Sequence, residues 1–121
     1  MLSGDARAFI RASIKSIWGL ELLLFLRAHA ERSWNVPEMV RELRASDPVV
    51  RGSLRFLVEV GAVAEDVGGT VRFAPSSPGV DGAVREIAET YATHPLAVTN
   101  EIYSPDSKIQ HFADAFRLKK E

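Results

Sequence analysis

The fold of this chain is decided by residues 35–63, which read NVPEMVRELRASDPVVRGSLRFLVEVGAV. Asn35 and Glu38 stand three residues apart in the Asn-x-x-Glu form of a capping box, so a helix is predicted to begin there. After a short turn, Asp47 as N-cap residue and Pro48 at the first helical position predict a second helix. The stretch therefore predicts two capped helices in close succession.

The second of these helices is expected to bury one side and expose the other. Its apolar residues repeat at i, i+4, i+7 and i+8, which is the spacing of one buried face. They are Val50, Leu54, Leu57 and Val58. Gly61 supplies the left-handed residue that ends the helix. The opposite face presents Pro48, Arg51, Gly52, Arg55 and Glu59, with Ser53 at its border.

The chain before this stretch predicts buried helical structure. Residues 7–32 contain no proline and only one glycine, Gly19, and the apolar residues of 20–26 lie all round the predicted helix. A helix that is apolar all round is a buried one. Two arrangements fit the sequence, namely one long helix bent near Gly19, or two abutting helices with Ser16 as a second N-cap.

The pattern after the second capped helix is strand-like. Residues 62–66 and 70–74 read as two short strands separated by Val67-Gly68-Gly69. A Gly-Gly pair can supply the positive φ angles that tight hairpin turns need. Residues 75–79 have the composition of a loop. The expected fold class is therefore mainly α with a small β-hairpin.

Composition indicates one folded domain. The chain has 121 residues, 46% of them hydrophobic, a formal net charge of -1 and no cysteine. These values exclude global disorder, disulfides and thiol chemistry. The longest apolar run, residues 17–26, is shorter than the roughly 18 residues of a membrane span. We therefore expect a cytoplasmic protein without a signal peptide or a membrane partner. Near-neutral charge excludes a polycation that coats nucleic acid, but it permits a local basic face.

From about Ser16 to Pro75 the sequence predicts, in this order, a helix, a capped helix, a short turn, a second capped helix and a hairpin. In this order the chain resembles the winged helix-turn-helix regulators of bacteria. The resemblance rests on residues 35–43 and 47–60 and on the exit Leu57-Val58-Glu59-Val60-Gly61-Ala62-Val63 into the hairpin. It implies a winged helix-turn-helix domain over residues 1–79, with added N- and C-terminal helices. Residues 80–121 would form a helical dimerisation or partner region in the same compact unit, similar to multidrug- and metal-responsive regulators.

The resemblance implies a DNA-binding transcription regulator that places a helix, at about residues 48–60, in the major groove. Arginine can pair bidentately with guanine, and flanking cations contact phosphate. The alternative for each arginine is an ordinary solvated side chain. The candidate DNA contacts are Arg41, Arg44, Arg51, Gly52, Ser53, Arg55 and Arg72.

The charge pattern limits how much the hairpin can contribute to DNA binding. Glu65 and Asp66 precede its turn and Arg72 is its only cation, so we expect a weak contact there. Between Arg27 and Arg55 the cations outnumber the acids only slightly. A winged-helix module that docks a protein and binds no DNA is therefore the competing interpretation.

Two apolar stripes mark the C-terminal third, each at helical spacing. A core built on the winged domain has room for one of them, and monomers rarely expose the other. The short terminal helix, with its two phenylalanines, is expected to bury its stripe on its own domain or on another chain. A two-fold homodimer is the prediction, and a second protein partner at the C-terminal helix is the alternative. The stripes consist of Val84, Ile87 and Tyr91, and of Ile109, Phe112 and Phe116.

Nothing in the sequence predicts an enzyme, a cofactor or a metal site. The three histidines are scattered, and none belongs to a recognisable nucleophile motif. His111 and Asp114 stand i, i+3 in the last predicted helix, with His94 as a further ligand at most. These groups fall short of a closed tetrahedral site unless a second subunit completes it, so no metal is predicted.

Overall fold

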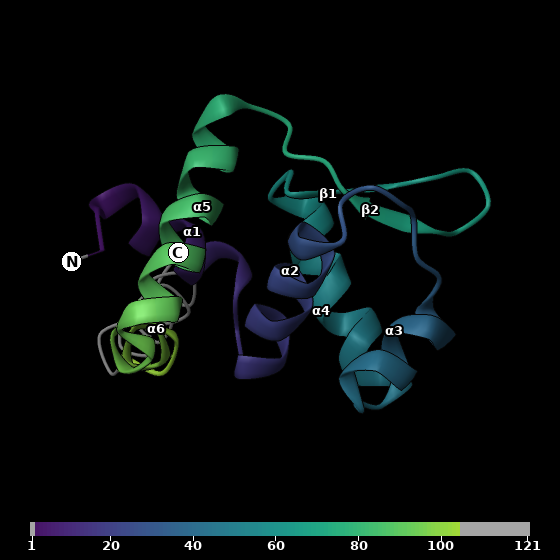
Figure 1. Ribbon diagram of the computed structural model, residues 1–121, viewed down its shortest axis with the longest axis horizontal. Coiled ribbons are helices and arrows are strands. Elements are labelled where there is room, and N and C mark those ends of the chain that lie inside the picture. The colour runs from purple at the N-terminus through teal and green to yellow at the C-terminus, as the bar shows by residue number, and fades with distance from the viewer. Residues whose placement is uncertain (1, 105–121) are drawn as a thin grey trace, which may run out of the picture.

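Helices make up most of this structure, a computed structural model that describes residues 2–104. Four helices come first, namely α1 (Gly4–Ser13), α2 (Ile17–Ala28), α3 (Val36–Leu43) and α4 (Asp47–Glu59). The strands β1 (Val63–Glu65) and β2 (Val71–Phe73) and the helices α5 (Pro78–Thr93) and α6 (Pro95–Ile102) follow (Figure 1). The expected class, mainly α with a small β-hairpin, is confirmed.

The N-terminal helical segment consists of two abutting helices, which is the second of the two arrangements that the sequence allowed. The Ser16 hydroxyl accepts the Gly19 N–H at 3.4 Å and so caps α2. Ile14, at the end of α1, has an extended backbone. The chain therefore turns between the two helices instead of bending within one.

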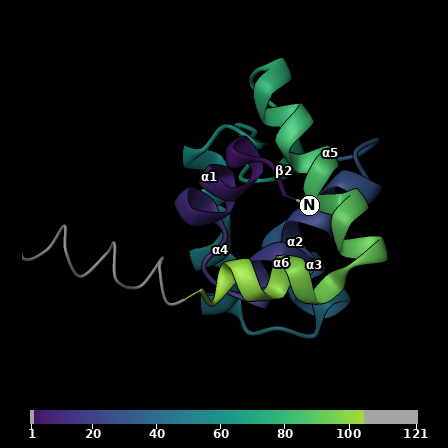
Figure 2. The same ribbon diagram turned by 90° about the vertical axis from the view of Figure 1, so that its left-hand side faces the viewer.

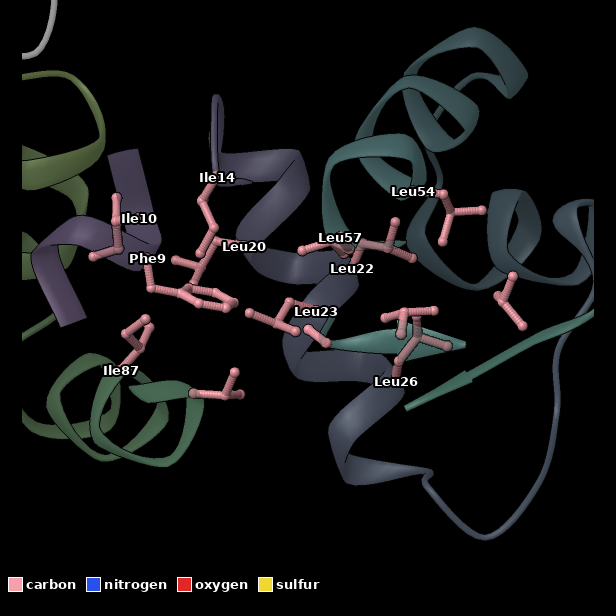
Figure 3. Packing of buried hydrophobic residues seen from close by; sticks show 14 of the residues in the cluster. Phe9, Ile10, Ile14, Leu20, Leu22, Leu23, Leu26, Leu54, Leu57 and Ile87 are labelled. Atoms are coloured by element: carbon pink, nitrogen blue, oxygen red, sulfur yellow. The ribbon is translucent and has the colours of Figure 1, made fainter. Parts of the chain in front are cut away.

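The position of α2 explains why its apolar residues surround it. Figure 1 shows α2 between α1 and α5 on one side and α4 on the other. In the close view, α2 separates Phe9 and Ile87 from Leu57 (Figure 3). The leucines of α2 that fill this space, all nearly inaccessible to solvent, are Leu20, Leu22, Leu23 and Leu26. No helix within residues 2–104 has both the length and the apolar character that a membrane crossing needs.

The capping box at the start of α3 is confirmed in both directions. The Asn35 side chain accepts the Glu38 N–H at 2.9 Å, and the Glu38 carboxylate accepts the Asn35 N–H at 2.9 Å. At the other end of α3, Arg44 takes a left-handed backbone conformation with φ 54°. This residue turns the chain toward α4.

The start of α4 differs from the prediction by one residue. Ser46, not Asp47, is the N-cap, since its hydroxyl accepts the Val49 N–H at 3.3 Å. Serine and aspartate cap helices about equally well, so the sequence alone did not separate them. Asp47 lies in the first turn, where its carboxylate is 2.7 Å from Arg51 Nε.

The inner face of α4 contains three of its four expected residues. Val50, Leu54 and Leu57 are buried, whereas Val58 is 37% exposed. The prediction for Val58 was wrong because eight residues at 3.6 per turn overshoot two turns by about 80°, which moves Val58 to the flank of the helix.

The hairpin is confirmed, and a third segment pairs with it. β1 and β2 are antiparallel, with Ala64 opposite Arg72. Trp34 exchanges two backbone hydrogen bonds with Val71, of 2.7 and 2.8 Å. This bridge holds the hairpin beside the start of α3. Gly61 has φ 84°, and a Cβ there would clash with Ser76, so the turn into β1 needs glycine.

The first C-terminal stripe is part of the chain's own core, which corrects part of the predicted interface. Val84 and Ile87 of α5 are fully buried, so neither can contact a second copy. Tyr91 is half-buried and donates a hydrogen bond to Glu21 of α2 at 3.0 Å.

Residues 75–79 are not all loop, because Ser77 caps α5 and the helix begins at Pro78.

The helices α5 and α6 pack against α1, and the residue that ends α6 contacts the start of α2. Figure 2 shows α5 and α6 meeting at an angle, with α1 packed against both. Arg7 and Arg11 of α1 place Nε atoms 3.3 and 3.4 Å from the Glu101 carboxylate. The Tyr103 hydroxyl accepts the Ile17 N–H at 2.8 Å. The described chain therefore ends next to the first turn of α2.

Candidate functional site

The outer surface of α4 lies between two grooves, each of about 330 Å³. One, here called the hairpin groove, separates α4 from β1 and β2. The other, here called the α2 groove, separates α4 from the first turn of α2. The candidate contacts on α4 are divided between them. Arg51 and Arg55 line the hairpin groove, and Gly52 and Ser53 line the α2 groove.

The hairpin groove combines apolar side chains with charges of both signs. The glutamates offset the local charge of the arginines, so the groove as a whole is close to neutral. Its apolar lining residues are Val36, Leu54, Val58 and Val71, and its charged ones are Arg51, Arg55, Glu59 and Glu65.

The two arginines of this groove differ in how they are engaged. Arg51 Nε lies 2.7 Å from the Asp47 carboxylate one turn earlier, and both side chains are exposed. Within residues 2–104, the Arg55 side chain takes part in no hydrogen bond or ion pair. Arg55 is therefore the more available of the two for an external anion or a base edge.

Two further candidate arginines lie where α3 ends. Arg41 and Arg44 are exposed, and neither forms an ion pair with another described residue. Their positions, in the last turn of α3 and in the turn after it, place both cations near the beginning of α4.

Arg72 on β2 is only partly available, because it faces Asp66 across the hairpin turn. Its Nε lies 3.8 Å from the Asp66 carboxylate. The same carboxylate accepts hydrogen bonds from Ser33 at 2.7 Å and from Thr70 at 3.2 Å. The hydrogen bond from Ser33, with smaller contributions from Thr70 and Arg72, holds the pKa of Asp66 below its ordinary value. Asp66 is thus a structural acid of the turn.

The α2 groove has a different character, because its lining is largely apolar. Trp18, which is 42% exposed, forms one wall, and Val49 and Phe56 of α4 form the other. Gly52 and Ser53 lie on the α4 side and are half-buried. These two residues therefore adjoin an apolar surface, away from Arg51 and Arg55.

Sequence reasoning missed the parts played by Val58 and Trp18. Periodicity assigned Val58 to the core, and Trp18 belongs to the longest apolar run, residues 17–26. A helical projection that measures true angles would have moved Val58 to the flank, but no sequence signal identifies Trp18 as a groove wall. Its exposure depends on where α2 approaches α4.

The remaining sequence predictions concern residues 105–121, which are outside the described part of the chain. Ile109, Phe112 and Phe116 belong to this range, as do His111 and Asp114. Among residues 2–104, no three or more His, Asp or Glu side chains gather closely enough to hold a metal ion.

Comparisons of this chain with models of protein families, with curated proteins and with solved structures found no match in any of the three.

Proposed function

We propose that this chain is a DNA-binding transcription regulator of the winged helix-turn-helix type. In this proposal α3 and α4 form the helix-turn-helix, the β1–β2 hairpin forms the wing, and α4 enters the major groove. The observation that carries it is the order α2, α3, short turn, α4, hairpin, together with exposed arginines on the outer half of α4. A helix-turn-helix of this kind reads DNA with the outer face of its second helix.

The arginines divide into two roles in this proposal. Arg55 and Arg51 lie one turn apart on α4 and would contact base edges or adjacent phosphates. Arg41 and Arg44 would contact the phosphate backbone, which positions the protein without reading sequence. Arg72 contributes weakly, because Asp66 already offsets part of its charge.

The regulator is proposed to act as a homodimer through its C-terminal third. With Val84 and Ile87 in the core, the described surface of this region that supports the proposal is on α6. Leu96 is 72% exposed there, and Tyr103, seven residues later, is 46% exposed. Tyr103 is the C-cap residue of α6, so the exposed apolar side chain within the helix itself is Leu96. A two-fold dimer would present two copies of α4 to one duplex.

The hairpin groove favours one competing function, a winged-helix module that binds a protein. Its apolar residues and balanced charges suit a peptide side chain better than a phosphate backbone. A module of this kind would bind no duplex DNA even at low salt, whereas binding to phosphate is strongest there.

The proposal is tested by alanine variants at Arg55 and Arg51, measured by fluorescence anisotropy on a duplex selected by the wild-type chain. If these side chains pair with bases, each variant should lose about 1–3 kcal/mol of specific binding. Arg85→Ala serves as the matched control, because Arg85 is an exposed arginine on α5. Unchanged affinity in a folded Arg51→Ala/Arg55→Ala double variant would exclude α4 as the reading helix.

A further inference from the structure

The α2 groove is built for an apolar occupant. Trp18, Val49 and Phe56 supply its walls, and both Trp18 and Val49 keep more than a third of their surface exposed. Exposed large apolar side chains that share one hollow mark a contact surface more often than isolated ones do.

Three of the polar side chains that border the α2 groove are engaged within the chain, whereas the Ser53 hydroxyl, which also lines it, forms no hydrogen bond with another described residue. The Ser13 hydroxyl donates to the Phe9 carbonyl at 2.7 Å, and Ser16 caps α2. The Lys15 ammonium lies 5.4 Å from the centre of the Phe56 ring and donates to the Arg11 carbonyl. The groove therefore offers apolar surface and few free hydrogen-bonding groups, which disfavours a polar ligand.

The chain itself brings a suitable occupant to this place. Tyr103 is fixed to Ile17, the neighbour of Trp18, by the 2.8 Å hydrogen bond to its hydroxyl. The described residues end at Ser104, and 105–121 continue from there. Only a few residues separate Ser104 from Ile109, and each extended residue spans about 3.3–3.6 Å. A side chain at 109 or beyond is thus within reach of Trp18.

We propose that residues 105–121 cover the α2 groove of their own chain through Ile109, Phe112 and Phe116. These three residues stand at i, i+3 and i+7, which is the spacing of one apolar helical face. Tethering favours the chain's own segment over that of a second copy, because a short link gives a local concentration of about millimolar. The inference does not rest on the proposed DNA binding, but it removes Gly52 and Ser53, which line the covered groove, from the candidate DNA contacts. It leaves Leu96 on α6 as the apolar surface for a dimer.

The test follows the exposure of Trp18 in the full-length chain. The chain has two tryptophans, so incorporation of 5-fluorotryptophan gives two fluorine resonances. The Trp18 resonance is the one absent from a Trp18→Phe variant. Its shift between light and heavy water reports contact with solvent. Trp34 is buried, so an unchanged Trp34 resonance shows that a variant is folded.

Phe112→Ser/Phe116→Ser should increase the solvent isotope shift of Trp18 about twofold, as the uncovered ring gains a second open face. Gln110→Ser/Asp114→Ser changes polar residues of the same segment and should leave the shift unaltered. Val49→Asp, a substitution at a partly exposed groove wall, should raise the Trp18 shift as well. If the double serine variant changes the Trp34 resonance and is therefore not correctly folded, Val49→Asp supplies the test instead. A Trp18 shift that is equal in wild type and in both Phe112→Ser/Phe116→Ser and Val49→Asp would overturn the proposal. So would a Trp18 shift that rises on twentyfold dilution of the wild type, because it would assign the covering segment to a second copy.

Discussion

Arg44 is the only residue other than glycine with a positive φ angle in the described chain, with φ 54° and ψ 40°. Helices often end on a residue in this conformation, and glycine adopts it at least cost. An arginine in this left-handed conformation costs about 1–2 kcal/mol of conformational free energy relative to one with a right-handed helical backbone. Its side chain is exposed at the turn into α4, so the proposed phosphate contact gives the arginine a function at a costly position.

Replacement of Arg44 should therefore separate stability from binding. Arg44→Gly is expected to raise the free energy of unfolding by about 1 kcal/mol and to weaken duplex binding, because it relieves the backbone and removes a cation. Arg44→Ala should weaken binding equally without the gain in stability. Urea unfolding and fluorescence anisotropy measure the two effects. Wild-type affinity in Arg44→Gly would remove Arg44 from the proposed contacts.

At the scale of elements, the start of α3 shows how a local motif sets a pH dependence. The Asn35 N–H donates to the Glu38 carboxylate, and Arg32 lies 2.7 Å from it. The hydrogen bond from Asn35, followed by that from Arg32, holds the pKa of Glu38 below its ordinary value of 4.5. The stabilisation is therefore complete above pH 4.5 and is lost as the pH falls through the lower pKa of the folded state.

Glu38→Gln should reduce this pH dependence, because glutamine can still accept the Asn35 N–H but does not titrate. We expect wild type to lose stability below pH 4.5 with a steeper slope than Glu38→Gln, measured by urea unfolding at a series of pH values. Glu42→Gln, at an exposed carboxylate of the same helix, is the matched control. Equal slopes in wild type and Glu38→Gln would show that the capping carboxylate does not contribute.

The elements themselves were largely predictable because their signals are local. The Asn35–Glu38 box and the left-handed Gly61 both depend on residues within one or two turns. The break at Ser16 was only one of two arrangements that the sequence allowed. The start of α4 was placed one residue late because Ser46 and Asp47 are comparable caps. Val58 was misassigned because a spacing of eight residues drifts out of the buried stripe.

The candidate site was predictable only in part. Helical periodicity placed Arg51 and Arg55 on the exposed side of α4, and both are exposed. The division into two grooves could not be predicted, because it depends on how the hairpin and the start of α2 approach α4. The same holds for the bridge between Trp34 and Val71.

At the scale of the whole molecule, one core joins the two halves of the chain. Leu23 and Leu57 belong to the same buried cluster as Ile87 and Val98. The ion pairs of Glu101 with Arg7 and Arg11 tie α6 to α1 at the surface. The exposed side of α6, with Leu96, is thereby held in a fixed position relative to α4, as the proposed dimer with two DNA-contacting helices would require.

Leu96→Glu should therefore convert a dimer to a monomer and lower operator affinity although α4 is unchanged. A charge at the centre of an apolar contact is costly to bury, so the dimer should dissociate. The affinity of the variant for DNA should then fall, because a monomer binds only one half-site. Sedimentation at micromolar concentration measures the mass. Val67→Glu makes the same change at an exposed residue of the hairpin turn and should leave the dimer intact. A wild-type monomer would exclude the homodimer.

The central claim, that this chain binds duplex DNA through α4 and its neighbouring arginines, is tested most directly by the salt dependence of wild-type binding. The duplex is taken from the protein's own promoter region, and affinity is measured by anisotropy across a range of salt concentrations. Phosphate contacts by Arg41 and Arg44, with a weaker one by Arg72, predict a slope of log affinity against log salt between about -2 and -3 for each chain. Arg41→Ala should reduce its magnitude by about one. No binding at low salt, or a slope near zero, would contradict the account and would favour a protein partner instead.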